Sequence, residues 1–158
     1  MNGRKEMDNM TILHYSKLHD KEHWLEEIGK SDWEAGEYLY AILRSGDFSG
    51  FCGEDSDLLL LTEGDKIVSY CTLAAKDNIQ PTDLTPWIGF VYTYPEYRGR
   101  HLAGKLIAFA EKEAAEKGAK ETHISTDNIG LYEKYGYTLL EETTDVGGEY
   151  ARIYIKKL

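Results

Sequence analysis

Runs of apolar residues mark the strands that the chain is expected to form. Asp57–Thr62 contains four consecutive leucines, Leu58 to Leu61, and predicts a buried strand. A turn at 63–66 separates it from Ile67–Leu73, where β-branched and aromatic residues favour a second strand. The two runs predict an antiparallel hairpin. Met10–Tyr15 is a shorter and weaker strand candidate.

Two segments before this hairpin have the apolar spacing of amphipathic helices. The pattern predicts one helix over His19–Lys30 and a second over Trp33–Arg44, each with its apolar residues on one side. Ser31 or Asp32 is expected to cap the second helix, because short polar side chains accept hydrogen bonds from the first free amides. Gly46 is expected to end it.

The second half of the chain alternates strands with helices. A loop over 78–86 contains Pro81 and Pro86, which cannot donate to a strand ladder, and leads into a third strand, Trp87–Tyr94. Gly89 inside that strand predicts a bulge or a close approach of another group to the backbone. The remaining expected elements are a helix over Arg100–Lys117 ended by Gly118, a strand over Glu121–Thr126, a short helix over Ile129–Tyr135 capped by Asp127 or Asn128 and ended by Gly136, and a hairpin of Tyr137–Thr144 with Glu149–Ile155.

This order of elements predicts an α/β sandwich built around a mixed sheet. The chain has 158 residues, with no internal repeat and no Pro/Gly/Ser-rich linker, so one domain over 1–158 is expected.

Composition narrows the function classes. A formal net charge of −10 argues against DNA or RNA as partner. The acidity either attracts a cationic substrate or only aids solubility. Cys52 and Cys71 are expected to be free thiols. No apolar run approaches the roughly 20 residues of a membrane span, and Met1–Glu6 is not followed by the apolar stretch of a secretion signal, so a cytoplasmic protein is expected.

The segment Pro95–Lys105 lies between a predicted strand and the longest predicted helix. The first amides of a helix have no intrahelical partners, and together with the helix dipole they suit a phosphate group. Gly99 would let the backbone approach a phosphate closely, and nearby basic side chains would add charge-assisted contacts. Neither a Walker loop nor a dinucleotide-binding fingerprint is present.

Arg98–Ala103 resembles the [Gln/Arg]-x-x-Gly-x-[Gly/Ala] motif of the GNAT superfamily of N-acetyltransferases, which cradles the pyrophosphate of coenzyme A. His101 stands where the family has its first glycine. Because His has a Cβ, either the loop avoids positive φ there or Gly104 provides the close approach instead. The resemblance implies coenzyme contacts from Arg98, Gly99, Arg100, His101, Leu102, Ala103, Gly104 and Lys105.

Asp127–Tyr137 resembles a second GNAT motif, Leu-Tyr-Glu-Lys-x-Gly-[Phe/Tyr], whose first tyrosine is the usual general acid. That tyrosine is Tyr132 here. Seven positions earlier, where the family often has Asn, this chain has Ser125, and Asn128 is expected to replace its contacts to the pantetheine arm. The resemblance also implies that the arm pairs with the backbone of Val91, Tyr92 and Thr93.

The family resemblance implies a mixed, mostly antiparallel twisted sheet flanked by helices, and acetyl transfer from acetyl-coenzyme A to an amine of a small molecule or protein. It also favours a homodimer. The third strand has no carboxylate to act as general base, so Asp83, Glu54, His123 and a chain of water molecules stay open. The acceptor region is expected in the two N-terminal helices and loop 78–86, whose aromatic and acidic residues form either a cation pocket or ordinary core and surface: Trp24, Trp33, Glu34, Glu37, Tyr38 and Tyr40.

Three alternatives accompany this reading. In the first, the chain is a non-catalytic acyl-coenzyme A sensor, and in the second it binds a nucleotide at the Arg98–Lys105 turn. His19 and His23, four residues apart, have a spacing that suits zinc, although a solvated helix face without metal is the expected arrangement.

Overall fold

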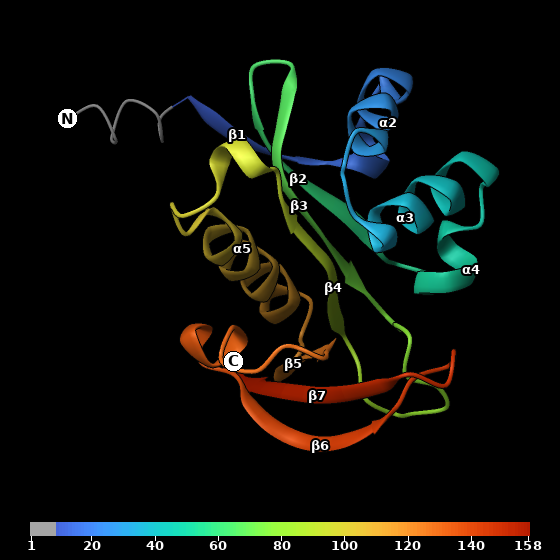
Figure 1. Ribbon diagram of the computed structural model, residues 1–158, viewed down its shortest axis with the longest axis vertical. Helices are drawn as coiled ribbons and strands as arrows, with labels where there is room; N and C mark the ends of the chain where they lie inside the picture. The colour runs from blue at the N-terminus through green and yellow to red at the C-terminus, as the bar shows by residue number, and fades with distance from the viewer. Residues whose placement is uncertain (1–8) are drawn as a thin grey trace.

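A computed structural model describes residues 9–158 (Figure 1). Met1–Glu6, where no secretion signal is expected, lies outside this range. Among the described residues, no helix combines the length and the apolar character that crossing a membrane requires.

Within residues 9–158, seven strands form one sheet in the order β1-β2-β3-β4-β5-β7-β6. Neighbouring strands are antiparallel except β4 and β5, which are parallel, so the prediction of a mixed, mostly antiparallel sheet is confirmed. The strands are β1 (Met10–His14), β2 (Asp57–Glu63), β3 (Lys66–Ala74), β4 (Trp87–Thr93), β5 (Glu121–Thr126), β6 (Thr138–Thr144) and β7 (Tyr150–Lys157).

Helices cover both faces of the sheet. The longest helix, α5, lies on one face, while α2, α3 and α4 lie on the other (Figure 1). The helical elements are η1 (Tyr15–Lys17), α2 (Lys21–Gly29), α3 (Glu34–Ser45), α4 (Phe48–Cys52), η2 (Pro95–Tyr97), α5 (Leu102–Glu116) and η3 (Tyr132–Tyr135).

The leucine run of β2 explains why the core has two halves. Leu59 and Leu61 pack into the apolar cluster beneath α5, whereas Leu58 and Leu60 pack into the cluster beneath α2 and α3. Successive side chains of a strand point to opposite faces, so a continuous apolar run is what a strand covered on both faces needs.

Several expected helix ends are wrong. The first helix begins at Lys21 rather than His19. Neither Ser31 nor Asp32 caps α3, whose N-cap residue is Trp33. The Ser31 hydroxyl instead donates to the carbonyl oxygen of Ile28, at 2.5 Å, and accepts from Tyr70 at 3.0 Å. Ser31 is therefore fixed by the core and not by the helix end.

The expected helix over 129–135 is also shorter than predicted. Only the 3-10 turn η3 forms, with Leu131 at its N-cap, and neither Asp127 nor Asn128 caps it. Gly130 has a φ of 92°, which is outside the helical region and delays the start of the turn. The five-residue helix α4 was not predicted. The expected helix ends at Gly46 and Gly136 are confirmed, and both glycines have positive φ.

Candidate active site

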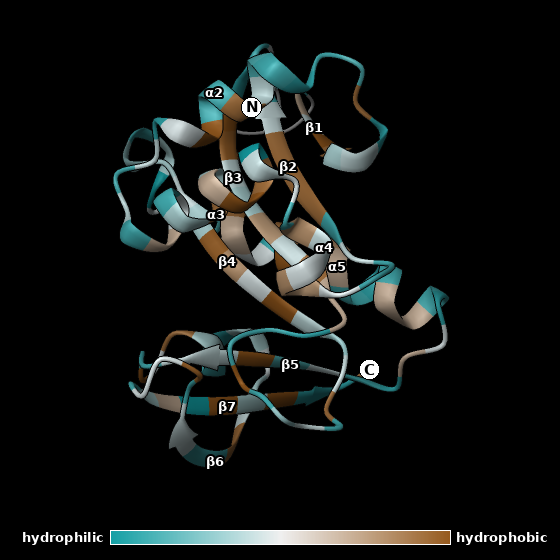
Figure 2. Cartoon of the chain, turned by 90° about the vertical axis from the view of Figure 1, so that its right-hand side faces the viewer, coloured by the Kyte–Doolittle hydropathy of each residue, from teal (hydrophilic) through white to brown (hydrophobic). Residues whose placement is uncertain are grey.

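The parallel strands β4 and β5 separate soon after they meet. Their register contains one pair, Trp87 with His123. Beyond that pair the two strands diverge, and β5 continues beside β7 instead (Figure 2). The edge of β4 that faces β5 therefore has no strand partner among the described residues along Val91, Tyr92 and Thr93, the residues expected to pair with a pantetheine arm.

A bulge in β4 lies next to this opening. The register between β3 and β4 shifts between Tyr70 and Thr72, opposite Gly89 and Phe90. Phe90 has a φ of 49°, a left-handed conformation that is uncommon for a residue with a Cβ. The prediction of a bulge at Gly89 is confirmed. Backbone strain of this kind costs free energy and clusters at binding sites.

The turn between β4 and α5 has the open backbone that an anion site needs. Gly99 has a φ of 82°, and a Cβ placed on it would have no neighbouring atom within 4 Å. His101 has a φ of 58° and is the N-cap residue of α5. The expectation that the loop avoids positive φ at His101 is therefore wrong, because His101 adopts the conformation that a glycine would.

Gly104 does not replace the missing glycine either. A Cβ on Gly104 would lie 2.7 Å from the ring of Tyr135, so this glycine makes room for η3 against α5. Leu102 is buried in the core beneath α5, which leaves only its backbone to face a ligand. Ala103 and Lys105 lie in the first turn of the helix, and Lys105 is exposed.

The basic residues of the turn stand at its surface and edge. Arg98 is exposed, and its Nε donates to the carbonyl oxygen of Thr93 at 2.8 Å while its guanidinium lies 5.4 Å from the ring centre of Tyr92. The guanidinium of Arg100 lies 5.9 Å from the ring centre of Tyr97. Arg98 thus supports the end of β4 directly, and its charge stands beside the turn.

Tyr132 lies under the opening between the strands. Its side chain is buried in the same apolar cluster as Ile88 of β4 and Ile124 of β5. Its hydroxyl has no hydrogen-bond partner among the residues that the structure describes. Burial raises the pKa of Tyr132 above its ordinary value, and the charges of Cys71, Tyr135 and Asp77 add to this effect. The hydroxyl is therefore protonated at neutral pH and free to donate.

The residue at the family's asparagine position is also free to bind. The Ser125 hydroxyl oxygen is buried and has no partner among the described residues. Asn128, expected to replace it, is exposed, and its carbonyl oxygen accepts a hydrogen bond from Tyr154 at 3.4 Å. Ser125, and not Asn128, therefore has a buried side-chain oxygen that a ligand could satisfy.

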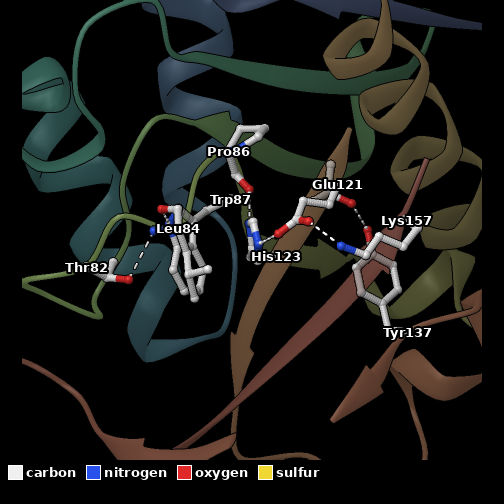
Figure 3. Close-up of polar contacts among 9 residues, drawn as sticks. Thr82, Leu84, Pro86, Trp87, Glu121, His123, Tyr137 and Lys157 are labelled. Atoms are coloured by element: carbon white, nitrogen blue, oxygen red, sulfur yellow. Dashed lines mark hydrogen bonds and ion pairs between the residues drawn. The ribbon is translucent and has the colours of Figure 1, made fainter. Parts of the chain in front are cut away.

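The three side chains considered as general base do not share one location. His123 is buried, with Nδ1 3.0 Å from the carbonyl oxygen of Pro86 and Nε2 2.7 Å from a carboxylate oxygen of Glu121 (Figure 3). Since both ring nitrogens are engaged, His123 fastens β5 to the preceding loop and has no free nitrogen for a substrate. Glu54 and Asp83 are both exposed.

Asp77, which the sequence did not single out, is the carboxylate nearest to the bulge. An ideal Cβ on Gly89 would lie 2.1 Å from Oδ2 of Asp77, so the carboxylate occupies the space that the missing side chain leaves. The other oxygen of Asp77 accepts from the backbone amide of Asn78 at 2.7 Å. Burial raises the pKa of Asp77 to about 6, partly offset by that amide.

The positions expected in an acceptor region divide evenly: Trp24, Trp33 and Tyr40 pack against the core, while Glu34, Glu37 and Tyr38 are exposed. Trp33 stacks on Tyr92 with ring centres 5.4 Å apart, and Tyr40 accepts a hydrogen bond from Arg44. Tyr38, in contrast, stays half exposed. His19 lies outside α2, and Nε2 of His23 lies 2.7 Å from the carbonyl oxygen of Asp65, so the two histidines do not share a helical face.

A separate hollow of about 760 Å³ lies at the far end of α5, between His14, Asp57 and Glu113. It is at the helix end opposite the turn, so the features of the site do not depend on it.

These features together fit an acyl-coenzyme A. The amides of residues 99–104 suit the phosphates, and the unpaired edge of β4 suits a pantetheine arm with its two amide groups. The buried, unpartnered oxygen of Ser125 has the chemistry to bind such an amide.

Comparison with known proteins identifies the family and the fold. The model of the acetyltransferase (GNAT) family matches residues 15–137. No curated protein matches the chain. An acetyltransferase from Streptococcus agalactiae is similar in structure, with a TM-score of 0.67 and 18% identity over 95% of this chain and 99% of its own.

Two similar structures contain the coenzyme. A GNAT family acetyltransferase from Elizabethkingia anophelis with acetyl-coenzyme A bound has a TM-score of 0.61 and 18% identity, over 96% of this chain and 99% of its own. A GNAT family N-acetyltransferase from Escherichia coli in complex with coenzyme A has a TM-score of 0.67 and 17% identity, over 94% of this chain and 81% of its own. At these sequence identities, the structural similarity shows that the chain shares the fold of these proteins.

Proposed function

Because the chain belongs to the GNAT family of acetyltransferases, we propose that it transfers an acetyl group from acetyl-coenzyme A to a primary amine, with Tyr132 as general acid. The observation that carries the proposal is Tyr132: its side chain is buried in the cluster that contains Ile88 of β4 and Ile124 of β5, and its hydroxyl has no partner among the described residues. The anion-suited turn begins where β4 ends, so phosphates held there would direct the rest of the molecule into the opening between β4 and β5.

Each part of the coenzyme has a place in the proposal. The backbone from Arg98 to Lys105 holds the pyrophosphate, with Arg100 and Lys105 supplying positive charge. The open edge of β4 at Val91–Thr93 holds the pantetheine arm, and Ser125 holds an amide of it. The coenzyme supplies the acetyl group as an activated thioester.

Tyr132 has the properties that the departing sulfur requires. A thiolate that leaves in an apolar site gains from a proton donor within hydrogen-bond reach. A tyrosine is protonated at neutral pH at its ordinary pKa, and burial raises the pKa of Tyr132 further; no other group competes for its proton among the described residues. Its side chain packs edge-to-face on Tyr137, with ring centres 6.4 Å apart, and this contact fixes its position.

The cytoplasm is the proposed location. Cys52 and Cys71 are both free and buried, as expected of thiols in a reducing compartment.

The experiment measures thiol release from acetyl-coenzyme A over a panel of amines, for the wild type and Tyr132→Phe. We expect Tyr132→Phe to lower turnover by about 10²–10⁴-fold with unchanged affinity for the coenzyme, since Phe keeps the buried ring and removes the proton. Tyr135→Phe, on the same turn, is the control and should stay near the wild type.

Two results would contradict the proposal. If acetyl-coenzyme A binds but no amine is acetylated, the chain is an acyl-coenzyme A sensor. If ATP binds at the turn and acetyl-coenzyme A does not, the chain is a nucleotide-binding protein.

A further inference from the structure

Two unpartnered oxygens meet beside the bulge of β4. Oδ2 of Asp77 lies 2.1 Å and Oγ1 of Thr72 lies 3.2 Å from the point where Gly89 would have its Cβ. Thr72 is fully buried, and its hydroxyl has no hydrogen-bond partner among residues 9–158. Nor does Oδ2 of Asp77 have one in that range. The side-chain oxygen of the next residue, Asn78, is likewise buried and unpartnered.

Such a group of oxygens needs a donor. A carboxylate and an amide oxygen can only accept hydrogen bonds, and a buried acceptor that lacks a donor destabilises the fold. A primary ammonium group has three N–H donors and a positive charge, so it would satisfy the carboxylate better than any neutral donor.

Asp77 and Tyr132 approach the bulge from opposite faces of the sheet. Tyr132 packs with the cluster beneath α5. Asp77 stands on the face of α3 and α4. On that face its charge helps to raise the pKa of Cys52 of α4, and the side chain of Phe90 packs there. Acetyl transfer needs this separation, because the incoming nitrogen and the departing sulfur occupy different positions around the carbonyl carbon.

Three aromatic rings, those of Tyr38, Phe51 and Phe90, contact one another on that face. Phe90 follows Gly89 directly, and its ring centre lies 5.7 Å from that of Phe51 and 6.4 Å from that of Tyr38. The backbone amide of Lys76 donates to the carbonyl oxygen of Cys52 at 2.9 Å, which fixes the end of α4 beside Asp77. Phe51 and Phe90 are partly exposed and Tyr38 is half exposed, so the rings present apolar surface to solvent.

We propose that Asp77 binds the ammonium group of the acceptor and takes its proton, and that the acceptor is a primary amine with a single positive charge on an apolar body. The inference rests on the proposed function and assigns its acceptor site. One carboxylate against Gly89, followed by Phe90 and its ring neighbours Tyr38 and Phe51, matches one charge on an apolar body, whereas a polyamine carries further charges for which Asp77 offers no second carboxylate.

The proton balance follows from these positions. Asp77 takes one proton from the ammonium group and passes it to solvent, and the neutral nitrogen forms the N–C bond as the C–S bond breaks. Tyr132 gives its proton to the departing sulfur. The second proton of the nitrogen leaves through Asp77 to solvent, and Tyr132 regains a proton from solvent, so one proton is released overall.

The test compares Asp77→Asn with the wild type, using 2-phenylethylamine and spermidine as probes. Asn keeps the shape of Asp77 and can still accept from the amide of Asn78. Calorimetry on the protein without coenzyme should show 2-phenylethylamine bound at least tenfold more weakly by Asp77→Asn, and spermidine bound at least tenfold more weakly than 2-phenylethylamine by the wild type. In turnover, kcat/KM for 2-phenylethylamine should fall about 10²–10³-fold with unchanged affinity for acetyl-coenzyme A.

The pH profile separates a proton acceptor from a structural residue. The wild-type kcat/KM should rise with pH to a bend near pH 6, and Asp77→Asn should lack that bend. The groups around Asp77 are Lys76 beside it, Cys52 of α4, Tyr132 of η3 and, through Asn78, Asp145. Cys52 has its pKa raised to about 12 by burial, far from the bend.

Two further variants sharpen the result. Asp83→Asn removes an exposed carboxylate from the same loop and should leave binding, turnover and pH profile unchanged. Gly89→Ala places a methyl group on the position of the Asp77 carboxylate and should weaken 2-phenylethylamine binding without removing the charge.

The possible outcomes distinguish a failure of this inference from a failure of the proposed acetyltransferase function. If Asp77→Asn binds and acetylates 2-phenylethylamine like the wild type while Tyr132→Phe is impaired, the chain is an N-acetyltransferase and Asp77 is not its base. Preference of the wild type for spermidine overturns the apolar acceptor. Absence of 2-phenylethylamine binding to the wild type overturns the acceptor site, and failure to acetylate any amine overturns the proposed function.

Discussion

His101 shows how one residue can break a motif and keep its geometry. With φ of 58° and ψ of 29°, it holds the left-handed conformation at the N-cap of α5 in which the family has glycine. An L-residue in that region costs about 1–2 kcal/mol. The chain therefore keeps the turn at a cost in stability.

We expect His101→Gly to leave coenzyme A affinity within about threefold of the wild type, because the backbone already has the glycine-like conformation. Stability should change by less than about 1 kcal/mol, since relief of strain is offset by the greater freedom of glycine in the unfolded chain. Calorimetry with coenzyme A and urea unfolding measure the two quantities. A tenfold gain in affinity would instead mean that the His101 side chain obstructs the phosphates.

Asp77 should make the protein less stable at neutral pH. Its pKa is 3.8 ordinarily and about 6 in the folded protein, so the folded state binds the proton more tightly than the unfolded state. Below pH 3.8 the carboxyl group is protonated in both states, and its burial does not lower the free energy of unfolding. The free energy of unfolding falls as the pH rises from 3.8 towards 6, and the full loss is present above pH 6. Asp77→Asn should therefore raise the free energy of unfolding by on the order of 2 kcal/mol at pH 7.5 and by little at pH 4.

Urea unfolding at both pH values measures this difference, with Asp83→Asn as the matched control. A variant that is less stable than the wild type at pH 7.5 would show that Asp77 is held by favourable contacts and not by enclosure.

The sequence identified some site residues and missed others for a physical reason. Tyr132 and the 98–105 turn stand in contiguous motifs, so their neighbours along the chain reveal them. Asp77 lies in a loop without a motif, and it reaches the bulge only because β3 and β4 pair in a register that brings Thr72 opposite Gly89. The absence of a side chain at Gly89 was visible in the sequence, but the group that fills the space was not.

Among the elements, long periodic segments were predictable and short ones were not. The strands of the β2–β3 hairpin and the helix α5 each carry enough apolar residues to define a face. Helix α4 has five residues, too few for a helical period to stand out, and its position depends on aromatic contacts such as Phe51 with Tyr38, 5.3 Å between ring centres. The prediction that Ser31 caps α3 was wrong because the Ser31 hydroxyl forms hydrogen bonds with Ile28 and Tyr70 instead.

Helix α5 is fastened to the C-terminal strands by a buried polar cluster. Glu111 is buried and accepts from the Tyr137 hydroxyl at 2.9 Å, while its other oxygen lies 3.0 Å from Nζ of Lys156. The Thr122 hydroxyl lies 2.7 Å from the same tyrosine oxygen. One carboxylate thus connects α5 to β5, β7 and the end of η3.

We expect Glu111→Ala to lower the free energy of unfolding by about 2–4 kcal/mol, because it leaves a partly buried ammonium group and a buried hydroxyl without their acceptor. Glu116→Ala, at an exposed position of the same helix, should change it by less than about 0.5 kcal/mol. Urea unfolding of both variants measures the contrast. Equal stability of the two would mean that the Glu111 cluster contributes no net free energy to the fold.

The charge of the whole molecule bears on substrate capture. A formal net charge of −10 attracts a cationic amine over distances that salt shortens, with a screening length of about 10 Å at 0.1 M ionic strength. We expect kcat/KM for a cationic amine to fall about three- to tenfold between 20 mM and 500 mM KCl. The affinity for anionic acetyl-coenzyme A should fall less, because salt screens the repulsion from the net charge as well as the attraction to Arg100 and Lys105. The difference between the two substrates provides the internal control, since a general effect of salt on folding would weaken both alike. If neither responds to salt, the acidity serves solubility alone, and recognition of the amine depends on groups at contact distance such as Asp77.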